Sequence, residues 1–363
     1  MMQHQPTSKI ERGTNVSEAI RKNFASDNIA PACPEVMDAM IRANSGPAPA
    51  YGGDEQSTTL EARFAELFEH DLRCFPIATG TAANSLALAA LVPPYGAVLC
   101  DQSAHIANDE GGAPEFFTHG AKLITIPSDD GRMLPDALQT TIELNREGGI
   151  QSTPARALSL TQATEWGTVY SLARLRELTA IARQNNLPVH MDGARLANAV
   201  AHLDCSLADI TWKLGIDVLS FGGTKNGAIA AEAVLFFNTA LAEDFIRRIK
   251  RGGHLWSKQR YLSAQLLPLL HDNLWLKHAR QANAMAQRLA HGLRRQPGAK
   301  LPFEVQGNEV FVVLPEPLVT QLEAAGYVFY RWPTPAGVDG TLIRLVTHYA
   351  TEQTDVDALL ASL

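Results

Sequence analysis

Cysteine is scarce in this chain, with four residues among 363, and none forms a Cys-x-x-Cys pair or lies beside a run of histidines. Neither a zinc site nor a disulfide framework is therefore expected. No apolar run approaches the ~20 residues that span a bilayer, and the polar N-terminus does not resemble a signal peptide. Lys and Arg total 31 against 38 for Asp and Glu, and the net charge of −7 gives no general attraction to nucleic acid or anionic lipid. We expect a soluble, cytoplasmic protein that binds no metal, nucleic acid or membrane.

Several motifs of common enzyme classes are also missing. The chain contains no Gly-x-Gly, so the dinucleotide fingerprint fails at its first step, and it has no Gly-Lys-Ser/Thr for a phosphate-binding loop. It has neither a Gly-x-Ser-x-Gly nucleophile elbow nor a His-Glu-x-x-His helix. Its length and its hydrophobic fraction of 46% nevertheless predict a globular protein of two unequal domains. Its chemistry must come from another source.

Short apolar runs alternate with helical patterns through most of the chain. The runs occupy residues 73–78, 97–100, 122–126, 157–161, 188–191, 217–221 and 232–237. The helical patterns lie near 58–70, 81–91, 135–147, 171–186 and 193–203. Because parallel strands need crossover connections, this alternation predicts an α/β domain with a mostly parallel central sheet and helices on both faces.

Beyond residue 239 the pattern changes to a helix-rich stretch that ends near residue 295. Strand-like runs return at 309–314, 327–331 and 342–347, before a last helix for which Thr354 is the expected N-cap. This order predicts a smaller α+β domain. The predicted organisation is a polar arm at 1–23, a large α/β domain at 24–250 and a small domain at 251–363.

Two predicted strand ends carry residues suited to an anionic cofactor. Gly80 and Thr81 open a helix of small residues, where the backbone N–H groups of residues 80–82 and the helix dipole favour a phosphate. Alternatively, Thr81 only caps the helix. Asp192 ends a buried run, and Arg195 follows three residues later, so that a carboxylate and a guanidinium can face one cleft. The alternative here is a local ion pair between Asp192 and Arg195.

Lys225 and His105 complete the set of candidate residues. Lys225 lies in a glycine-rich turn between two apolar runs, where a partly desolvated amine suits Schiff-base chemistry, although an exposed turn lysine is the simpler alternative. His105 follows another strand end and can stack on a planar ring or move a proton, which most histidines do not do. A phosphate cradle, an acid for a ring nitrogen, a flat side chain and a reactive amine together suit pyridoxal 5′-phosphate.

The ordered motifs resemble those of the low-specificity threonine aldolases, within the β-eliminating lyase group of fold-type I pyridoxal phosphate enzymes. The resemblance extends from about residue 24 to residue 348, and the run from Ser220 to Gly227 is most similar to the branch that includes phenylserine aldolases. The motifs that carry it are Ser26-Asp27, Tyr51-Gly52, Gly80-Thr81, His105, Asp192-Gly-Ala-Arg195, Thr224-Lys225-Asn226-Gly227 and the segment from Leu342 to His348.

The resemblance implies a role for each of these residues. Lys225 would bond to the cofactor aldehyde, Asp192 would bind the pyridine nitrogen, and Arg195 would bind the phenolic oxygen. Gly80 and Thr81 would hold the phosphate, and His105 would stack on the ring. Ser26 and Arg344 would hold the substrate carboxylate. Tyr51 would reach a neighbouring subunit's site, and the basic stretch 247–258 would bridge subunits at a phosphate, which implies a homo-oligomer, a dimer of dimers.

One position departs from the family pattern. Many members carry a histidine one turn before the segment that here begins at Gly167, near the substrate's β-hydroxyl, whereas this chain has Glu165. The group that accepts the hydroxyl proton is therefore left open between His105, Glu165 and an ordered water.

The implied activity is retro-aldol cleavage of L-β-hydroxy-α-amino acids, such as threonine, allo-threonine and phenylserine, to glycine and an aldehyde. The same cofactor serves β-elimination, racemisation and transamination, so another enzyme of this fold is the main alternative. A non-catalytic, cofactor-binding regulatory protein is a third hypothesis. No added DNA-binding motif supports it.

Overall fold

The computed structural model describes residues 21–334 and 337–363. The predicted polar arm at 1–23 therefore lies almost entirely outside the described residues. In the described part of the chain, no helix has both the length and the apolar character needed to cross a bilayer.

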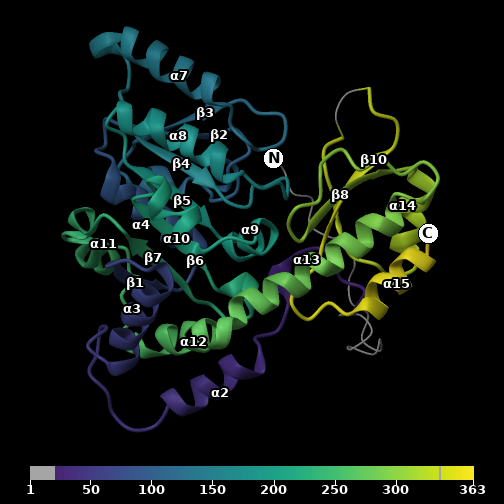
Figure 1. The fold of residues 1–363 in the computed structure, drawn as a ribbon, viewed down its shortest axis with the longest axis horizontal. Helices are drawn as coiled ribbons and strands as arrows, with labels where there is room; N and C mark the ends of the chain where they lie inside the picture. Colours follow the sequence, from purple (N-terminus) through teal and green to yellow (C-terminus); the bar gives the residue numbers. More distant parts are fainter. Residues whose placement is uncertain (1–20, 335–336) are drawn as a thin grey trace.

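A seven-stranded sheet forms the centre of the large domain, in the order β1-β7-β6-β5-β4-β2-β3 (Figure 1). Strands β2 to β6 pair only in parallel with one another, and β7 is antiparallel to both β1 and β6. The predicted α/β fold is confirmed. The strands are β1 (Arg73–Ile77), β2 (Ala97–Asp101), β3 (Lys122–Ile126), β4 (Ala155–Thr161), β5 (Val189–Gly193), β6 (Val218–Gly222) and β7 (Glu232–Phe236).

Helices cover both faces of this sheet because successive side chains of each strand point to opposite sides. In β6, Leu219 and Phe221 pack in one apolar cluster with α3, α8, α10 and α12, whereas Val218 packs in another with α4 and α11. The large-domain helices are α2 (Pro34–Ala43), α3 (Glu55–Phe68), α4 (Gly80–Leu91), α5 (His105–Asn108), α6 (Ala113–Phe117), α7 (Pro135–Glu147), α8 (Leu172–Gln184), α9 (Leu196–Leu203), α10 (Leu207–Ile210) and α11 (Phe245–Arg251).

A three-stranded antiparallel sheet, in the order β8-β10-β9, forms the small domain with helices on one side (Figure 1). Its elements are β8 (Glu309–Leu314), α14 (Glu316–Ala324), β9 (Tyr330–Arg331), β10 (Thr341–Val346) and α15 (Gln353–Ala361). The expected N-cap at Thr354 is wrong. The N-cap is Glu352, two residues earlier, and Glu352 and Asp355 form a capping box in which the Asp355 carboxylate accepts a bond from the Glu352 N–H.

Two further helices, α12 (Arg260–Leu270) and α13 (Leu274–Leu293), join the domains. Helix α12 packs against α2 and α3, and the 20-residue α13 contacts both α9 and α15. The predicted boundary between residues 250 and 251 falls inside α11. The division of the chain at that point stays a prediction.

Candidate active site

The carboxyl ends of the parallel strands bring most of the predicted site residues together. Asp192 lies at the end of β5, and Lys225 lies in the short 3-10 helix η4 (Thr224–Asn226) after β6. Two glycines allow this close approach: a Cβ at Gly222 would lie 2.4 Å from the Ala194 carbonyl oxygen, and one at Gly193 would lie 2.8 Å from the Ser220 carbonyl oxygen. The ends of β5 and β6 can therefore pack only with glycine at both positions.

Lys225 is half-buried, and no hydrogen bond or ion pair joins its amine to another described residue. Its positive charge acts to lower the pKa values of Asp27, His105 and Glu232, although other causes raise the pKa values of His105 and Glu232 overall. The amine therefore lies near these three groups, which come from different parts of the chain. The alternative of a solvent-exposed turn lysine does not match this position.

Asp192 is buried, with a relative exposure of 4%, and both of its carboxylate oxygens are held. Oδ1 accepts a bond from the Ala194 N–H at 3.0 Å, and Oδ2 accepts one from the Asn84 amide at 2.9 Å. Asn84 comes from α4, which covers this face of the sheet. The carboxylate is therefore fixed in orientation before any ligand arrives, and no ion pair with Arg195 is formed, contrary to the alternative interpretation of this motif.

A chain of hydrogen bonds connects Asp192 to His105. The same Asn84 amide nitrogen donates to Glu110 Oε1 at 2.8 Å, and that oxygen also lies 2.9 Å from His105 Nδ1. Burial lowers the pKa of His105, but the Glu110 hydrogen bond and the charges of Glu165 and Asp192 outweigh it and raise the pKa above its usual value. Burial raises the pKa of Glu110. Sequence reasoning gave neither Asn84 nor Glu110 a role.

The first turn of α4 differs from the sequence prediction at Ala82, and the alternative of a Thr81 cap is wrong. Thr79, not Thr81, is the N-cap, and its hydroxyl accepts a bond from the Ala82 N–H at 3.2 Å. Ala82 is therefore not free to bind an anion. The N–H groups of Gly80 and Thr81 have no acceptor within the helix, because they lie in its first turn.

Arg195 is held in a buried cluster that the sequence did not predict. Its guanidinium donates to Asp27 at 2.8 and 3.0 Å and lies 3.5 Å from Glu309. Burial raises the pKa of Asp27, but Arg195, Lys225 and the Asn308 amide together hold it well below its usual range. Asp27 and Arg195 are separated by 168 positions in the chain, so no local pattern links them.

Arg344 lies in the same cluster, on β10 of the small domain. It donates to Glu309 Oε1 and to the Ala25 carbonyl oxygen, each at 3.3 Å, and its guanidinium lies over the Trp332 ring at 4.9 Å. Ser26 follows Ala25 and caps a short 3-10 helix, accepting a bond from the Asn28 N–H at 3.2 Å. Ser26 and Arg344, which are predicted to hold the substrate carboxylate, are thus close together.

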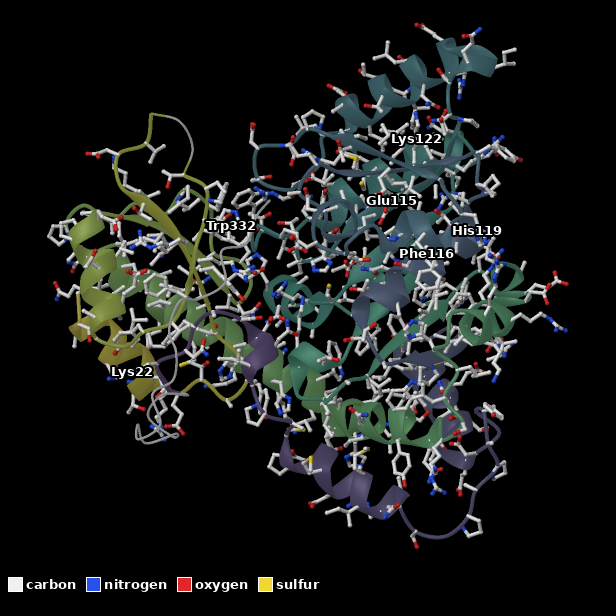
Figure 2. The ribbon with its side chains drawn as sticks, turned by 180° about the vertical axis from the view of Figure 1, so that it is seen from behind. Lys22, Glu115, Phe116, His119, Lys122 and Trp332 are labelled. Carbon is white, nitrogen blue, oxygen red and sulfur yellow. The ribbon has the colours of Figure 1, made fainter. Side chains whose placement is uncertain are left out.

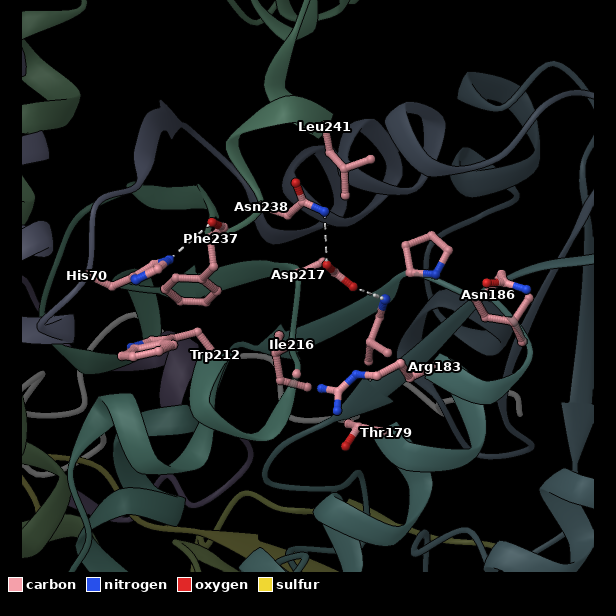
Figure 3. Close-up of a pocket in the computed structure, with 14 residues that line it drawn as sticks. His70, Thr179, Arg183, Asn186, Trp212, Ile216, Asp217, Phe237, Asn238 and Leu241 are labelled. Atoms are coloured by element: carbon pink, nitrogen blue, oxygen red, sulfur yellow. Dashed lines mark hydrogen bonds between the residues drawn. The ribbon is translucent and has the colours of Figure 1, made fainter.

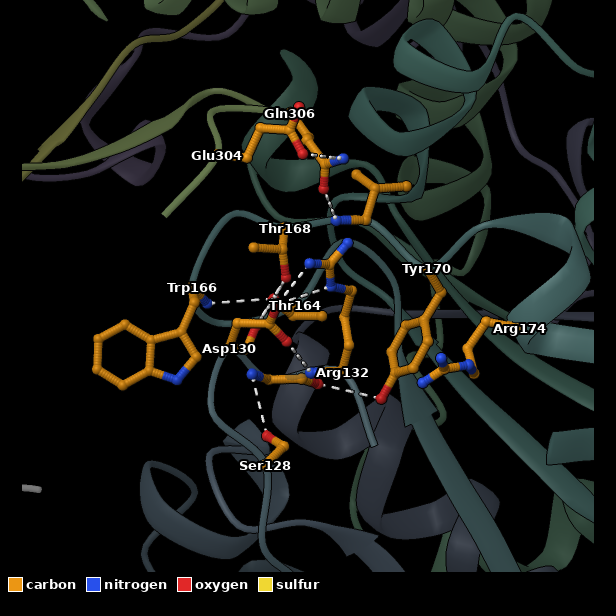
Figure 4. A network of polar contacts seen from close by, with 12 residues as sticks. Ser128, Asp130, Arg132, Thr164, Trp166, Thr168, Tyr170, Arg174, Glu304 and Gln306 are labelled. Carbon is orange, nitrogen blue, oxygen red and sulfur yellow. Dashed lines mark hydrogen bonds and ion pairs between the residues drawn. The ribbon is translucent and has the colours of Figure 1, made fainter. Parts of the chain in front are cut away.

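The loop between β4 and α8 places Glu165 near enough to His105 for its charge to raise the pKa of that imidazole. The Glu165 side chain has no hydrogen bond to any residue that the structure describes. A network of polar contacts fixes the loop around it (Figure 4): the Thr168 hydroxyl donates to the Asp130 carbonyl at 2.7 Å, and Gln306 of the small domain accepts from the Val169 N–H at 2.7 Å. These hydrogen bonds therefore fix the backbone of the loop that carries Glu165.

Glu232, on β7, is a further buried acid that sequence reasoning missed. Its Oε2 accepts a bond from the Gly223 N–H at 2.8 Å, two residues before Lys225. Burial raises the pKa of Glu232 to about 7. The hydrogen bonds of Thr224 and Gly223 and the charge of Lys225 act to lower this pKa but do not outweigh burial. The carboxyl group supports the turn that presents the lysine.

Tyr51 does not join the other predicted residues. It lies in the loop between α2 and α3, which Figure 1 shows at the lower end of the large domain, away from the small domain. Its N–H donates to the Ser257 carbonyl, and the Lys250 amine lies 4.7 Å from its ring centroid. The predicted contribution of Tyr51 to another subunit's site stays a prediction.

The opposite edge of the sheet carries a separate pocket of about 520 Å³ (Figure 3). It lies at the amino ends of β5 and β6, where Asp217 accepts a bond from the Val189 N–H, and His70 and Trp212 stack on one side. Because Asp192 and Lys225 lie at the other ends of these strands, this pocket is not the candidate active site.

The residues at the carboxyl ends of the parallel strands fit pyridoxal phosphate. A Cβ at Gly80 would meet no atom within 4 Å, so the space before the α4 N-terminus is open. Asn84 Oδ1 and Glu110 Oε2 are buried without a hydrogen-bond partner in the described part of the chain, as expected where a ligand supplies polar atoms. An anion cradle, a fixed carboxylate, an imidazole and an unpaired amine converge here.

Comparison with known proteins agrees with this geometry. Residues 23–317 match the beta-eliminating lyase family. The chain belongs to the beta-eliminating lyase family. It is 44% identical to the low specificity L-threonine aldolase of a Pseudomonas species, over 94% of this chain and 97% of that protein. It is 46% identical to the low specificity L-threonine aldolase of Pseudomonas aeruginosa, over 86% of this chain and 89% of that protein. A solved threonine aldolase from Leishmania major aligns with a TM-score of 0.88 at 29% identity, over 93% of this chain and 97% of that one.

Membership of the beta-eliminating lyase family establishes the chain as a pyridoxal phosphate enzyme with a fold-type I architecture. Lys225, Asp192, His105 and the α4 N-terminus are the residues available to bind that cofactor. Their individual roles, together with those of Arg195, Arg344, Ser26 and Glu165, remain predictions that the following proposals develop.

Proposed function

We propose that this lyase cleaves L-β-hydroxy-α-amino acids of the threonine, allo-threonine and phenylserine type to glycine and an aldehyde. The observation that carries the proposal is the unpaired Lys225 amine, whose charge acts on Asp27 of the buried cluster and which follows β6, the strand next to the one that Asp192 ends. The similarity to low specificity L-threonine aldolases over most of both chains supports it.

The cofactor-binding residues of this chain would each hold a defined part of the ligand. When bound, pyridoxal phosphate supplies an electron sink for the electron pair that remains when a bond to Cα breaks. Lys225 would bond to the cofactor, and Asp192, fixed by Asn84, would keep a proton on the ring nitrogen. Gly80 and Thr81 would donate N–H groups to the phosphate, and His105 would stack on the ring. Arg195 would donate to the phenolic oxygen.

The substrate carboxylate would be held by Arg344 with help from Ser26. Arg344 is 5% exposed, and its Nε has no hydrogen-bond partner in the described part of the chain, so it retains a donor for an incoming carboxylate. An Arg–carboxylate pair fixes orientation as well as position. Such fixing would set the Cα–Cβ bond for cleavage.

Cleavage also requires a base for the β-hydroxyl proton. The Glu165 side chain has no competing hydrogen bond among the described residues, and polar contacts hold its loop in place. His105 is close enough for the Glu165 charge to raise its pKa. We favour Glu165 as the acceptor, with His105 as the alternative. The hydroxyl proton leaves as the Cα–Cβ bond breaks, the aldehyde departs, and Cα is protonated to give glycine.

Product analysis tests the proposed reaction. The cofactor-loaded protein should convert threonine or phenylserine to glycine and acetaldehyde or benzaldehyde in equal amounts. Serine that yields ammonia and a keto acid would instead indicate β-elimination, and interconversion of alanine enantiomers would indicate a racemase. Protein that binds the cofactor but converts none of these amino acids would support a non-catalytic role.

We also propose a cytoplasmic homo-oligomer, a dimer of dimers, in which Tyr51 and the basic stretch 247–258 complete a neighbouring subunit's site. Tyr51 is half exposed and lies apart from its own chain's site residues, and apolar side chains such as Phe116, 75% exposed, lie bare on the surface of the large domain (Figure 2). Mixing two inactive variants, Lys225→Ala and Tyr51→Ala, should restore activity, because one hybrid site then contains both native residues. Absence of restoration would contradict shared sites.

A further inference from the structure

Glu309 accepts fewer and longer hydrogen bonds than the other carboxylate of the buried charge cluster beside the site. The cluster contains two carboxylates, Asp27 and Glu309, and two guanidiniums, Arg195 and Arg344. Asp27 accepts three hydrogen bonds of 2.8 to 3.0 Å. Glu309 uses only Oε1, at 3.3 Å from Arg344 and 3.5 Å from Arg195, and its Oε2 has no partner among the described residues.

The side chain of Glu309 is closed off from bulk solvent. Its side chain is fully buried at the start of β8, and a Cβ on Gly167 would lie 3.0 Å from its own Cβ, so the loop from the large domain closes over it. Burial raises the pKa of Glu309 against the charges of Arg195 and Arg344, and the charges of Glu165 and Asp27 raise it further.

Charge balance predicts what happens when a substrate carboxylate reaches Arg344. Before substrate binds, the two acids and two bases of the cluster are neutral together, and the charges of Lys225 and Glu165, which act on Asp27 and Glu309, also balance each other. A third carboxylate leaves it with one excess negative charge in a buried setting, which is unfavourable unless one acid takes up a proton. Asp27 is firmly ionised, whereas Glu309 is weakly held and has a free oxygen, so Glu309 is the acid that should accept the proton.

We propose that Glu309 holds Arg344 and Arg195 in place in the empty site and takes up a proton when the substrate carboxylate binds to Arg344. The proposal rests on the assignment of Arg344 in the proposed function. Substrate binding then consumes a proton, and affinity falls with rising pH by up to about tenfold per unit while Glu309 is ionised in the free protein. Glu309 is thus a positioning residue that makes carboxylate binding depend on pH.

Calorimetry with a substrate analogue tests the proposal. The probe is 3-hydroxybutyrate, which is threonine without its amino group and so cannot react with the cofactor. Its heat of binding to the cofactor-loaded protein is measured between about pH 6 and 8, in PIPES and in imidazole, which carry no primary amine and whose different ionisation enthalpies reveal proton uptake. Wild type should take up about one proton over part of this range.

Matched variants isolate the contribution of Glu309. Glu309→Gln should bind the analogue with proton uptake near zero and with little dependence on pH, whereas Glu309→Asp, which keeps a carboxyl group, should still take up a proton. Glu304→Gln removes an exposed glutamate five positions earlier and should behave as wild type. Circular dichroism checks that each variant is folded.

Two outcomes would overturn the proposal. One is proton uptake near zero in wild type at every pH, a result that needs no variant. The other is the same uptake in Glu309→Gln as in wild type. Binding to Arg344→Ala that equals wild type would refute the carboxylate assignment in the proposed function, whereas loss of that binding together with unchanged uptake in Glu309→Gln would refute only the role of Glu309.

Discussion

Replacing Glu232 with Gln should change how the stability of the protein depends on pH. In the native protein the buried carboxyl accepts from the Gly223 N–H at 2.8 Å, and a glutamine carbonyl can accept the same bond. The substitution therefore keeps the shape of the turn before Lys225 and removes only the ionisable proton.

The magnitude follows from the pKa of Glu232, which burial raises from 4.5 to about 7. Below pH 4.5 this group is protonated in both folded and unfolded chains and has no effect. As the pH rises towards 7, the unfolded chain loses the proton first, so the folded state loses stability, by roughly 3 kcal/mol in total. Glu232→Gln does not incur this loss.

Urea unfolding followed by circular dichroism at pH 5 and pH 8 measures the effect. The free energy of unfolding of Glu232→Gln, relative to wild type, should increase by roughly 2.5 kcal/mol between these values. The exposed Glu243→Gln variant should show no such change. A difference between Glu232→Gln and wild type that stays constant with pH, within about 1 kcal/mol, would refute the reasoning.

Three further changes test other parts of the site. Asp27→Ala should lower the free energy of unfolding by about 3–5 kcal/mol, because it leaves the buried Arg195 without its main partner, whereas the exposed Asp38→Ala should be nearly neutral in the same urea assay. Glu110→Gln should lower the pKa of His105, measured by NMR titration of the cofactor-free protein, and Asp109→Asn should not; an unchanged pKa would contradict the Glu110 contact. Glu165→Gln should reduce turnover of threonine by about 10²–10⁴-fold with little change in KM, and full turnover would exclude it as the base.

The fold followed from the sequence because its strands are continuous apolar runs. Residues 218–222 and 232–236 are buried on both faces, so their hydrophobicity alone marked them. The antiparallel direction of β7 was not predicted, since direction depends on the connection and not on composition. The N-cap of the last helix was predicted two residues too late, at Thr354. Glu352 is the N-cap, and it forms a capping box with Asp355.

The site was predictable only where a residue sits in a local motif. Lys225, Asp192 and His105 each end a strand pattern, and the structure places all three at one edge of the sheet. Asp27 was noted only within the Ser26-Asp27 motif, without a role, and Glu309 was not singled out, because their partners are distant in the chain: Asp27 meets Arg195 across 168 positions. Their chemistry exists only after the small domain packs on the large one.

Every role proposed for the other site residues depends on a bond between Lys225 and the cofactor. Reduction of the cofactor-loaded protein with borohydride, followed by digestion and mass spectrometry, would locate the bond directly. We expect a phosphopyridoxyl group on the peptide that contains Lys225 and none on the matching peptide of Lys225→Ala. A phosphopyridoxyl group found on a different lysine of the wild-type protein, with Lys225 unmodified, would contradict this expectation.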